Sequence, residues 1–279
     1  MRWKLIAFDL DDTLLDSEKR LPEENRRALC AAAERGLLLV PATGRILRGL
    51  PEALRSLPFL RYFILANGAA VYDAVEEKTL ARADIPLELT LEAMRFLDTQ
   101  PVIYDCYQNE IGWMSEELFA KAPEFLKGEP LILEMLGKLR VRVPDLKQTL
   151  LERGEPVQKI QFFYRPEDND KRLWMLRHFS ERFPALVATS SNSANIELNS
   201  VHAGKGNGLL ALCRALGIDP SDAVAFGDST NDVSLLRAAG RGVAMANAAE
   251  EVKAAADAVC ESNNACGVAK EIWRLLGES

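Results

Sequence analysis

The sequence predicts an α/β protein whose parallel sheet is interrupted by an inserted α+β domain. In the first and last thirds, short apolar runs alternate with helix-like segments, as in parallel sheets covered on both faces. The middle differs, because 12 of the 20 aromatic residues lie between Asp84 and Asn195 and strands and helices mix there. We expect a core domain from residues 1–83 and 196–279 and an inserted domain from residues 84–195. One continuous large α/β sheet is the alternative.

The first third provides strands, helices and a turn in alternation. Its strand-like runs are Lys4–Leu10, Leu37–Val40 and Tyr62–Ala66. Two segments have helical spacing: Pro22–Arg35, which ends at Gly36, and Ile46–Ser56. Asn67-Gly68 is a strong turn signal before Val71-Tyr72.

The remaining elements follow the same two patterns. In the middle we predict strands at Val102–Tyr107, Lys159–Tyr164 and Leu186–Thr189, and helices at Leu87–Leu97 and Asp170–Phe183. In the last third we predict strands at Ala223–Phe226 and Val243–Met245, and helices at Lys205–Leu216, Asp232–Ala239, Ala249–Ala256 and Val268–Leu276.

Composition limits the partners and the compartment. The 279 residues carry a net charge of −7, which gives no general attraction to nucleic acid or to an anionic membrane. The apolar stretch Leu5–Phe8 is too short for a signal peptide or a membrane span. Five cysteines without a Cys-x-x-Cys pair argue against disulfides and structural zinc. We expect a cytoplasmic protein that binds neither nucleic acid nor membrane.

Polar residues follow three of the predicted strands. Asp9, Asp11 and Asp12 follow the first strand, and Thr43-Gly44-Arg45 follow the second. Gly227-Asp228 follow the strand Ala223–Phe226, with Asn231-Asp232 close behind. Since the carboxyl ends of parallel strands share one edge of a sheet, these groups are expected to gather in one pocket.

The residue types indicate the chemistry of that pocket. Clustered aspartates without histidine or thiol suit a hard cation such as Mg²⁺. Thr43 and the Gly44 backbone, at a predicted helix N-terminus, suit phosphate oxygens. Lys205, between Gly204 and Gly206, opens another predicted helix and can supply positive charge. A metal ion, phosphate donors and a carboxylate nucleophile together predict phosphoryl transfer.

Four segments resemble the motifs of the haloacid dehalogenase-like hydrolases, in the same order and spacing. They are Asp9-Leu10-Asp11-Asp12-Thr13-Leu14, Thr43-Gly44-Arg45, Lys205 and Gly227-Asp228-Ser229-Thr230-Asn231-Asp232. The long insertion between the second and third motifs is similar to the cap of the Cof-type phosphatases. So are Asn67-Gly68, Gly242-Val243-Ala244-Met245 and Gly267-Val268-Ala269. The resemblance implies a Rossmann-like core and an inserted cap that determines specificity.

The resemblance also implies a role for each motif residue. Asp9 would attack phosphorus and Asp11 would act as the acid and then the base. Mg²⁺ would be held by Asp9, the Asp11 carbonyl and Asp228. Thr43, Gly44 and Lys205 would bind the phosphoryl group, while Asn231 and Asp232 would lie beside the metal or orient Lys205.

Two features of the first motif bear on these roles. Many members of the family carry glycine where this chain has Asp12, which we interpret as a tolerated change of the loop. The first step needs Asp9 ionised, which Mg²⁺ and Lys205 favour. It also needs Asp11 protonated, which a nearby carboxylate favours.

The expected function is a Mg²⁺-dependent phosphatase for small phosphorylated metabolites such as sugar phosphates or phosphorylated cofactors. A phosphosugar mutase of the phosphomannomutase type is the alternative enzyme, because the resemblance implies the same four motifs. A dehalogenase is less favoured, since halide departure needs no acid such as Asp11. A non-catalytic phospholigand-binding module is the alternative from another class, and the presence of both Asp9 and Asp11 argues against it.

Overall fold

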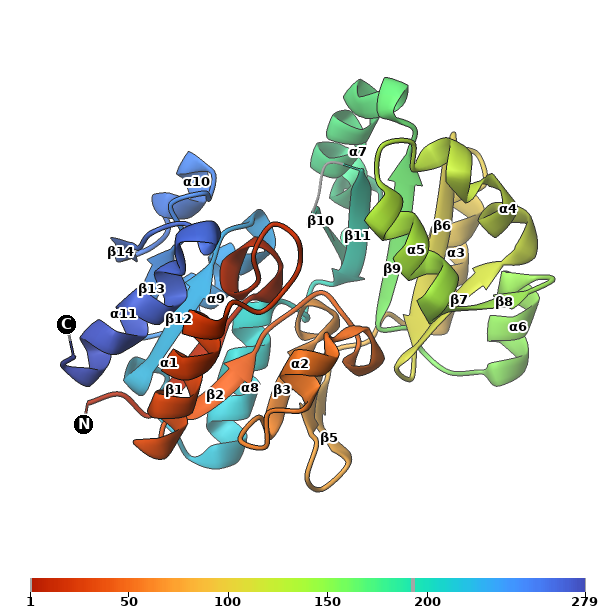
Figure 1. The fold of residues 1–279 in the computed structure, drawn as a ribbon. Helices are drawn as coiled ribbons and strands as arrows, with labels where there is room; N and C mark the ends of the chain where they lie inside the picture. Colours follow the sequence, from red (N-terminus) through yellow and green to blue (C-terminus); the bar gives the residue numbers. More distant parts are fainter. Residues whose placement is uncertain (1, 192–193, 279) are drawn as a thin grey trace. The chain divides into compact units, whose positions relative to one another are not determined.

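The computed structural model describes residues 2–191 and 194–278 and divides into two compact units. The first unit comprises Met1–Arg82 and Ala203–Ser279, and the second comprises Ala83–His202, so the second is inserted into the first (Figure 1). The sequence placed the insertion at 84–195. The chain leaves the second unit later than that, because β11 (Asn195–Ser200) pairs with β9 (Lys159–Tyr164) and with β10 (Leu186–Thr189).

The first unit is built on a parallel sheet with the strand order β14-β13-β12-β1-β2. Its strands are β1 (Leu5–Phe8), β2 (Leu38–Pro41), β12 (Ala223–Gly227), β13 (Arg241–Ala244) and β14 (Ala258–Val259). The apolar run of β1 alternates between two cores, as the two-residue period of a strand requires. Ile6 and Phe8 belong to one core, and Leu5 and Ala7 to the other.

Helices cover both faces of this sheet. The core that holds Ile6 and Phe8 includes residues of α1 (Glu23–Glu34) and α11 (Gly267–Leu276). The core that holds Leu5 and Ala7 includes residues of α8 (Lys205–Leu216) and α9 (Val233–Ala238). The predicted α/β class with a parallel sheet is therefore confirmed, and the short helix α10 (Glu250–Lys253) completes this part.

Several predicted elements of the first unit differ in the structure. The predicted helix Ala249–Ala256 is limited to α10 (Glu250–Lys253). The run Tyr62–Ala66 forms β3 (Tyr62–Leu65) of a separate antiparallel sheet with β4 (Ala70–Asp73) and β5 (Lys78–Arg82), linked to the end of β2 by one parallel bridge between Ala42 and Ile64. The predicted helix Ile46–Ser56 is two short pieces, Leu47–Gly49 and α2 (Glu52–Arg55). Pro51 separates them, since proline keeps the preceding residue extended.

The second unit contains a mixed sheet with the order β10-β11-β9-β6-β7-β8, in which only β7 and β8 pair in parallel. The strands not yet given are β6 (Val102–Gln108), β7 (Ile111–Ser115) and β8 (Arg140–Val143). One face packs on α3 (Leu87–Leu97), α6 (Leu146–Arg153) and α7 (Asn169–Arg182), and the other on α4 (Glu116–Phe125) and α5 (Pro130–Leu139). This is an α+β architecture, as the irregular pattern predicted.

Within the described ranges, no helix combines the length and the apolar character that crossing a bilayer requires.

Candidate active site

The first, third and fourth motifs meet at the carboxyl edge of the parallel sheet. Asp9 directly follows β1, and its backbone N–H donates to the Phe226 carbonyl at 3.0 Å, next to the fourth motif. Lys205, the first residue of α8, extends its Nζ to within 2.7 Å of Asp9 Oδ1 and 2.5 Å of Asp232 Oδ1. Its side chain is only 1 % exposed. The lysine therefore links two motifs that are far apart in the sequence.

Three carboxylates surround this single lysine. Asp9, Asp228 and Asp232 each present an oxygen within 4.8 Å of the others. Burial and the charges of the neighbouring aspartates raise the pKa of Asp9 well above its usual value, although Lys205 opposes this. Burial and the charge of Asp232 raise the pKa of Asp228 to about 6. The cluster thus has more negative charge than Lys205 balances, and its oxygen donors fit a hard divalent cation.

Lys205 itself stays protonated in this environment. Burial lowers the pKa of its ammonium group, but the charges of Asp232 and Asp9 outweigh burial and raise it. A buried cation with two carboxylate partners is a fixed positive charge, which suits the binding of a phosphoryl group.

Hydrogen bonds distinguish the roles of the two fourth-motif aspartates. Thr13 Oγ1 donates to Asp228 Oδ1 at 2.5 Å, and Ser229 Oγ donates to Asp228 Oδ2 at 2.9 Å. Asp232 Oδ2 accepts the backbone N–H groups of Asp228 and Ser229, both at 3.0 Å, while its Oδ1 holds Lys205. Both oxygens of Asp232 are therefore engaged in positioning Lys205 and the loop.

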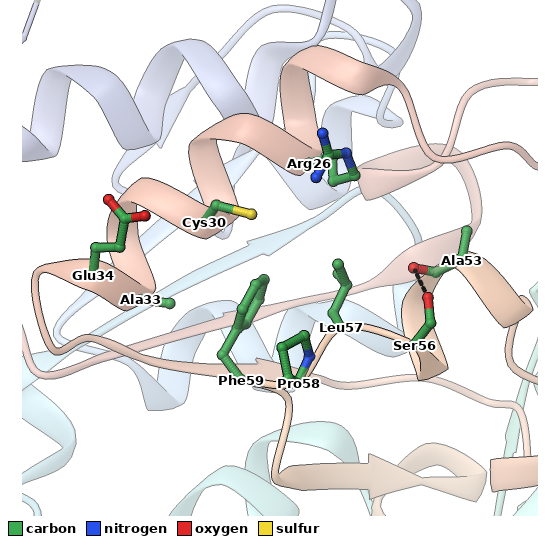
Figure 2. A pocket seen from close by; sticks show the side chains of 9 residues that line it. All are labelled: Arg26, Cys30, Ala33, Glu34, Ala53, Ser56, Leu57, Pro58 and Phe59. Carbon is green, nitrogen blue, oxygen red and sulfur yellow. Dashed lines mark hydrogen bonds between the residues drawn. The ribbon is translucent and has the colours of Figure 1, made fainter.

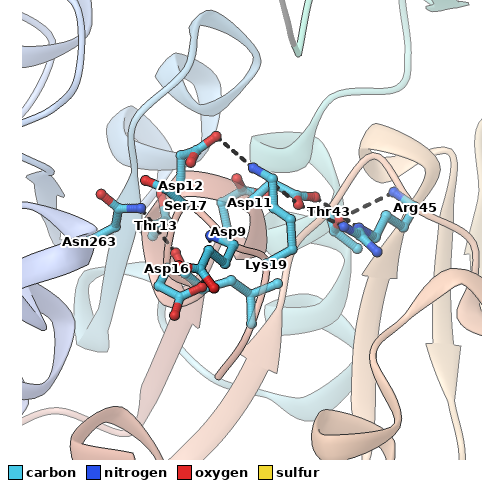
Figure 3. A network of polar contacts seen from close by, with 12 residues as sticks. Asp9, Asp11, Asp12, Thr13, Asp16, Ser17, Lys19, Thr43, Arg45 and Asn263 are labelled. Carbon is cyan, nitrogen blue, oxygen red and sulfur yellow. Dashed lines mark hydrogen bonds and ion pairs between the residues drawn. The ribbon is translucent and has the colours of Figure 1, made fainter. Parts of the chain in front are cut away.

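Asp11 is held by cations, contrary to the expected influence of a carboxylate (Figure 3). Arg45 Nε and Nη2 donate to its two oxygens at 2.8 and 2.7 Å, and Lys19 Nζ lies 3.6 Å from Oδ1. Burial raises the pKa of Asp11, but the charge and hydrogen bonds of Arg45, with Lys19, outweigh burial and lower it. The sequence indicated a nearby carboxylate as the influence on Asp11 and gave no sign that Arg45 would bind it.

The structure explains the departure at Asp12. Its φ of 61° lies in the left-handed region, where glycine is favoured and aspartate is among the better tolerated residues. Lys19 Nζ holds the Asp12 carboxylate at 2.7 Å, and Asn247 Nδ2 donates to the Asp12 carbonyl at 2.8 Å. The aspartate is thus held by contacts with Lys19 and Asn247.

The second motif lies beside the edge without a helix at its start. Thr43 is buried, its N–H donates to the Ile64 carbonyl at 2.8 Å, and its Oγ1 accepts the Arg45 N–H at 3.1 Å. Gly44 is half-buried in a bend, and the next helical turn begins only at Leu47. The expected helix N-terminus at Thr43-Gly44 is therefore absent, and the second motif is a loop.

Asn67 joins three motifs, a role that its interpretation as a turn residue did not include. Its N–H donates to the Thr43 carbonyl at 2.9 Å, and its own carbonyl accepts the Gly204 N–H at 2.8 Å. Its Oδ1 accepts a hydrogen bond from Asn231 Nδ2 at 3.2 Å. In the sequence, Asn67 directly follows the predicted strand Tyr62–Ala66. This position at the end of a strand is the signal that could have indicated its role in the site.

Gly68 packs against the backbone that carries Lys205. Its φ is 84°, and a Cβ there would lie 2.1 Å from the Gly204 carbonyl oxygen. We expect Gly68→Ala to destabilise the fold by about 1–3 kcal/mol, the usual cost of overpacking, and to reduce activity by displacing Lys205. The measurements are thermal unfolding and phosphate release.

Gly36→Ala is the matched control, since Gly36 also has a positive φ, 83°, but nothing lies within 4 Å of its Cβ position. It isolates the strain of the backbone from the clash with Gly204. If both variants lose the same stability and activity, the contact between Gly68 and Gly204 is not needed for the position of Lys205 or for activity.

A second pocket in the first unit is unrelated to these motifs. It has a volume of about 690 Å³ and lies between α1 and the segment from Ala53 to Phe59 (Figure 2). Leu57, Pro58 and Phe59 give it a largely apolar lining, and Arg26 at its border is already paired with Glu23. None of the predicted site residues lines it. Such a surface offers little to a phosphate group, so the candidate site is the edge described above.

Comparison with known proteins gives the same classification as the fold and the motifs. The model of the haloacid dehalogenase-like hydrolase family matches residues 6–272. Phosphatase YwpJ of Bacillus subtilis is 30% identical over 98% of this chain and 100% of its own length. A 5-amino-6-(5-phospho-D-ribitylamino)uracil phosphatase of the same organism, YcsE, is also 30% identical, covering 98% and 96%.

A solved haloacid dehalogenase-like hydrolase from B. subtilis superposes with a TM-score of 0.82 at 30% identity, over 98% of this chain and 99% of that one. The chain belongs to the haloacid dehalogenase-like hydrolase family, in its Cof-type phosphatase branch. The expected family and the expected enzyme class, a hydrolase, are thereby confirmed.

Proposed function

We propose that this protein is a Mg²⁺-dependent phosphatase that hydrolyses small phosphomonoesters through an aspartyl-phosphate intermediate. The observation that carries the proposal is the Asp9 carboxylate, positioned by β1 and paired at 2.7 Å with buried Lys205. Relatives named for their substrates act on small phosphorylated metabolites, a ribitylaminouracil phosphate for YcsE and HMP-PP for a phosphatase of Serratia proteamaculans.

The metal would be held by the Asp9 and Asp228 carboxylates and the Asp11 carbonyl. When bound, Mg²⁺ would offset the charge of the acidic cluster and polarise the phosphoryl group. Asp232 is assigned to Lys205 in this scheme because its Oδ1 pairs with the ammonium group and its Oδ2 accepts two backbone N–H groups. Among the residues that the structure describes, each oxygen of Asp228 accepts a hydrogen bond from only one hydroxyl. Thr13 and Ser229 orient Asp228 for its role.

The chain's own groups carry the two chemical steps. An oxygen of Asp9 forms a bond to phosphorus while the ester P–O bond breaks, and Asp11 donates a proton to the leaving oxygen. Asp11 then accepts a proton from water as the water oxygen attacks phosphorus. The bond from phosphorus to Asp9 breaks, which releases phosphate and restores both aspartates. Lys205, Thr43 and the Gly44 backbone hold the phosphoryl oxygens, and Asn231 lies beside them.

The acid role of Asp11 requires a change of partner for Arg45. While both guanidinium nitrogens hold the carboxylate, Asp11 stays ionised. An incoming phosphate dianion competes for the same guanidinium, because arginine binds phosphate with the geometry that it uses for carboxylate. We infer that substrate binding draws Arg45 from Asp11 and so allows Asp11 to take up its proton.

The second unit is assigned the selection of substrate, and the first unit the chemistry. This division follows the family's use of an inserted cap to limit access to small molecules. The net charge of −7 further disfavours a nucleic-acid substrate. We also propose a cytoplasmic location, where small phosphorylated metabolites are found.

Release of free phosphate tests the proposal against its alternatives. The purified protein is incubated with a panel of phosphorylated metabolites, with Mg²⁺ and with EDTA. A phosphatase releases inorganic phosphate only when Mg²⁺ is present. A mutase instead converts one sugar phosphate to its isomer without net release, and a binding module changes no substrate. Absence of release across the panel, with Mg²⁺ present, would count against hydrolysis.

The leaving group separates the role of Asp11 from that of Asp9. We expect Asp11→Asn to reduce hydrolysis of alkyl phosphates by ~10²–10⁴-fold, the usual contribution of general acid catalysis. The loss on p-nitrophenyl phosphate should be smaller, because p-nitrophenolate leaves with little need of a proton. Both values of kcat/KM are measured on one preparation, and equal losses would remove the acid role from Asp11.

A further inference from the structure

A cavity within the second unit gathers positive charge. It has a volume of about 390 Å³ and is lined by residues from the end of α4, the segment after it, the end of β9 and the start of α7. Three cationic side chains line it, Lys127, Arg165 and Arg172, whereas Glu129 is the acidic residue of the lining. Two aromatic side chains that are themselves buried, Phe125 and Tyr164, border it. The cavity is of the size that a small metabolite occupies.

Arg172 is a buried cation with neutral partners. It is 8 % exposed, and its Nε donates to Asn169 Oδ1 at 3.0 Å. Its Nη1 donates to Ser190 Oγ at 3.3 Å and to the Asn195 carbonyl at 3.4 Å. Within the part of the chain that the structure describes, no carboxylate forms an ion pair with it. Burial accordingly lowers the pKa of Arg172, with no acid to oppose the shift.

Other buried cations of this protein have carboxylate partners. Arg140 Nε lies 3.0 Å from Asp105, and Lys159 Nζ lies 2.8 Å from Glu197. A buried charge is costly unless it is paired with an opposite charge, so Arg172, whose partners are neutral oxygens, can still gain from an anion that comes from outside the chain.

The two remaining cations, Arg165 and Lys127, line the same cavity. Arg165 pairs with Glu124 at 2.8 Å and lies over the ring of Phe125, 4.2 Å from its centroid. Lys127 is exposed. In a chain with a net charge of −7, this concentration of positive charge is local to the cavity.

We propose that this cavity binds a small organic anion, with one carboxylate or phosphate group on Arg172 and its carbon skeleton against Phe125 and Tyr164. Arginine offers a planar pair of donors that matches either group. The residues that form this site are separate from Asp9, Lys205 and the other groups of the proposed phosphatase site. The inference therefore stands independently of the proposed function.

Crystals grown or soaked with selenate test the site directly. Selenium can be located by its anomalous signal, which distinguishes an anion at Arg172 from one at Lys205. We expect a peak within hydrogen-bonding distance of the Arg172 guanidinium. A crystal with selenate elsewhere and no peak at Arg172 would overturn the proposal.

Thermal unfolding provides the matching measurement in solution. Sulfate and malonate, representing tetrahedral and carboxylate anions, are titrated separately into the wild type, Arg172→Gln and Arg177→Gln. Arg177 is an exposed residue of the same helix, so its variant controls for the loss of one positive charge. Any anion binding at the phosphatase site contributes equally to all three proteins.

The expected result is a rise in melting temperature with at least one anion for the wild type and Arg177→Gln. Arg172→Gln should need about tenfold more anion for the same rise, as the loss of a charged hydrogen bond implies. Equal responses of the two variants would refute the site. Should Arg172→Gln fail to fold, Lys127→Gln replaces it in the titrations. Its control is Lys121→Gln, because Lys121 is an exposed lysine of α4.

Discussion

Replacement of Asp9 by asparagine is expected to lower steady-state phosphate release by at least about 10⁴-fold while the fold persists. An amide does not attack phosphorus, so no covalent intermediate can form at this position. The Asp9 backbone bond to Phe226 is unaffected by the change, and one charge leaves a crowded acidic cluster. The measurements are kcat with the best substrate of the panel and the melting temperature.

The control for this variant is Asp222→Asn, which makes the same chemical change before β12. The Asp222 side chain pairs with exposed Lys4 at 2.7 Å, and its backbone carbonyl accepts the Lys4 N–H. This variant should keep its activity. Turnover by Asp9→Asn at a rate near that of the control, with deamidation excluded by mass spectrometry, would eliminate Asp9 as the nucleophile.

Removal of the Lys205 ammonium group is expected to have the second large effect, on stability as well as on activity. Lys205→Met leaves Asp9, Asp228 and Asp232 buried together without their cation. Breaking a buried ion pair by removing one partner costs about 3–5 kcal/mol. Denaturant unfolding at neutral pH measures this loss, and phosphate release should fall because the phosphoryl oxygens lose a positive partner.

The physical origin of that loss can be checked with Mg²⁺. If the cost is charge repulsion, a divalent cation should restore more stability to Lys205→Met than to the wild type, since it binds the folded cluster. Lys4→Met is the control, because Lys4 is a surface partner of Asp222. A variant as stable as this control would show that Lys205 does not balance the buried acids.

Much of the architecture could be predicted because its signals are local. The apolar run Leu5–Phe8 has to be buried on both faces, and β1 lies inside the parallel sheet between β12 and the edge strand β2. Strand direction then places the residues after β1 and β12 at one edge, which is why Asp9 and Asp228 come together. The signal for the break at Pro51 was equally local. The helical spacing of the residues on both sides of Pro51 nevertheless led to the prediction of one continuous helix.

The partners of the charged groups could not be predicted in the same way. Arg45 and Asp11 are 34 positions apart, and nothing in either segment indicates that the guanidinium binds both carboxylate oxygens. The prediction that the surroundings of Asp11 favour its protonated form was therefore wrong, because Arg45 lowers the pKa of this carboxyl group. Asn67 and Arg172 are similar cases, since their importance depends on which groups lie within about 3 Å, the range of a hydrogen bond.

The amino-acid order alone determined the class of fold, the family and the segments from which the candidate site is assembled. Hydrophobic periodicity and strand direction act over a few residues, so they can be read along the chain. Only the tertiary structure decided which cation faces which carboxylate and which buried cation is left without one. Electrostatic energies depend on distance and burial, and neither quantity exists until remote segments have packed together.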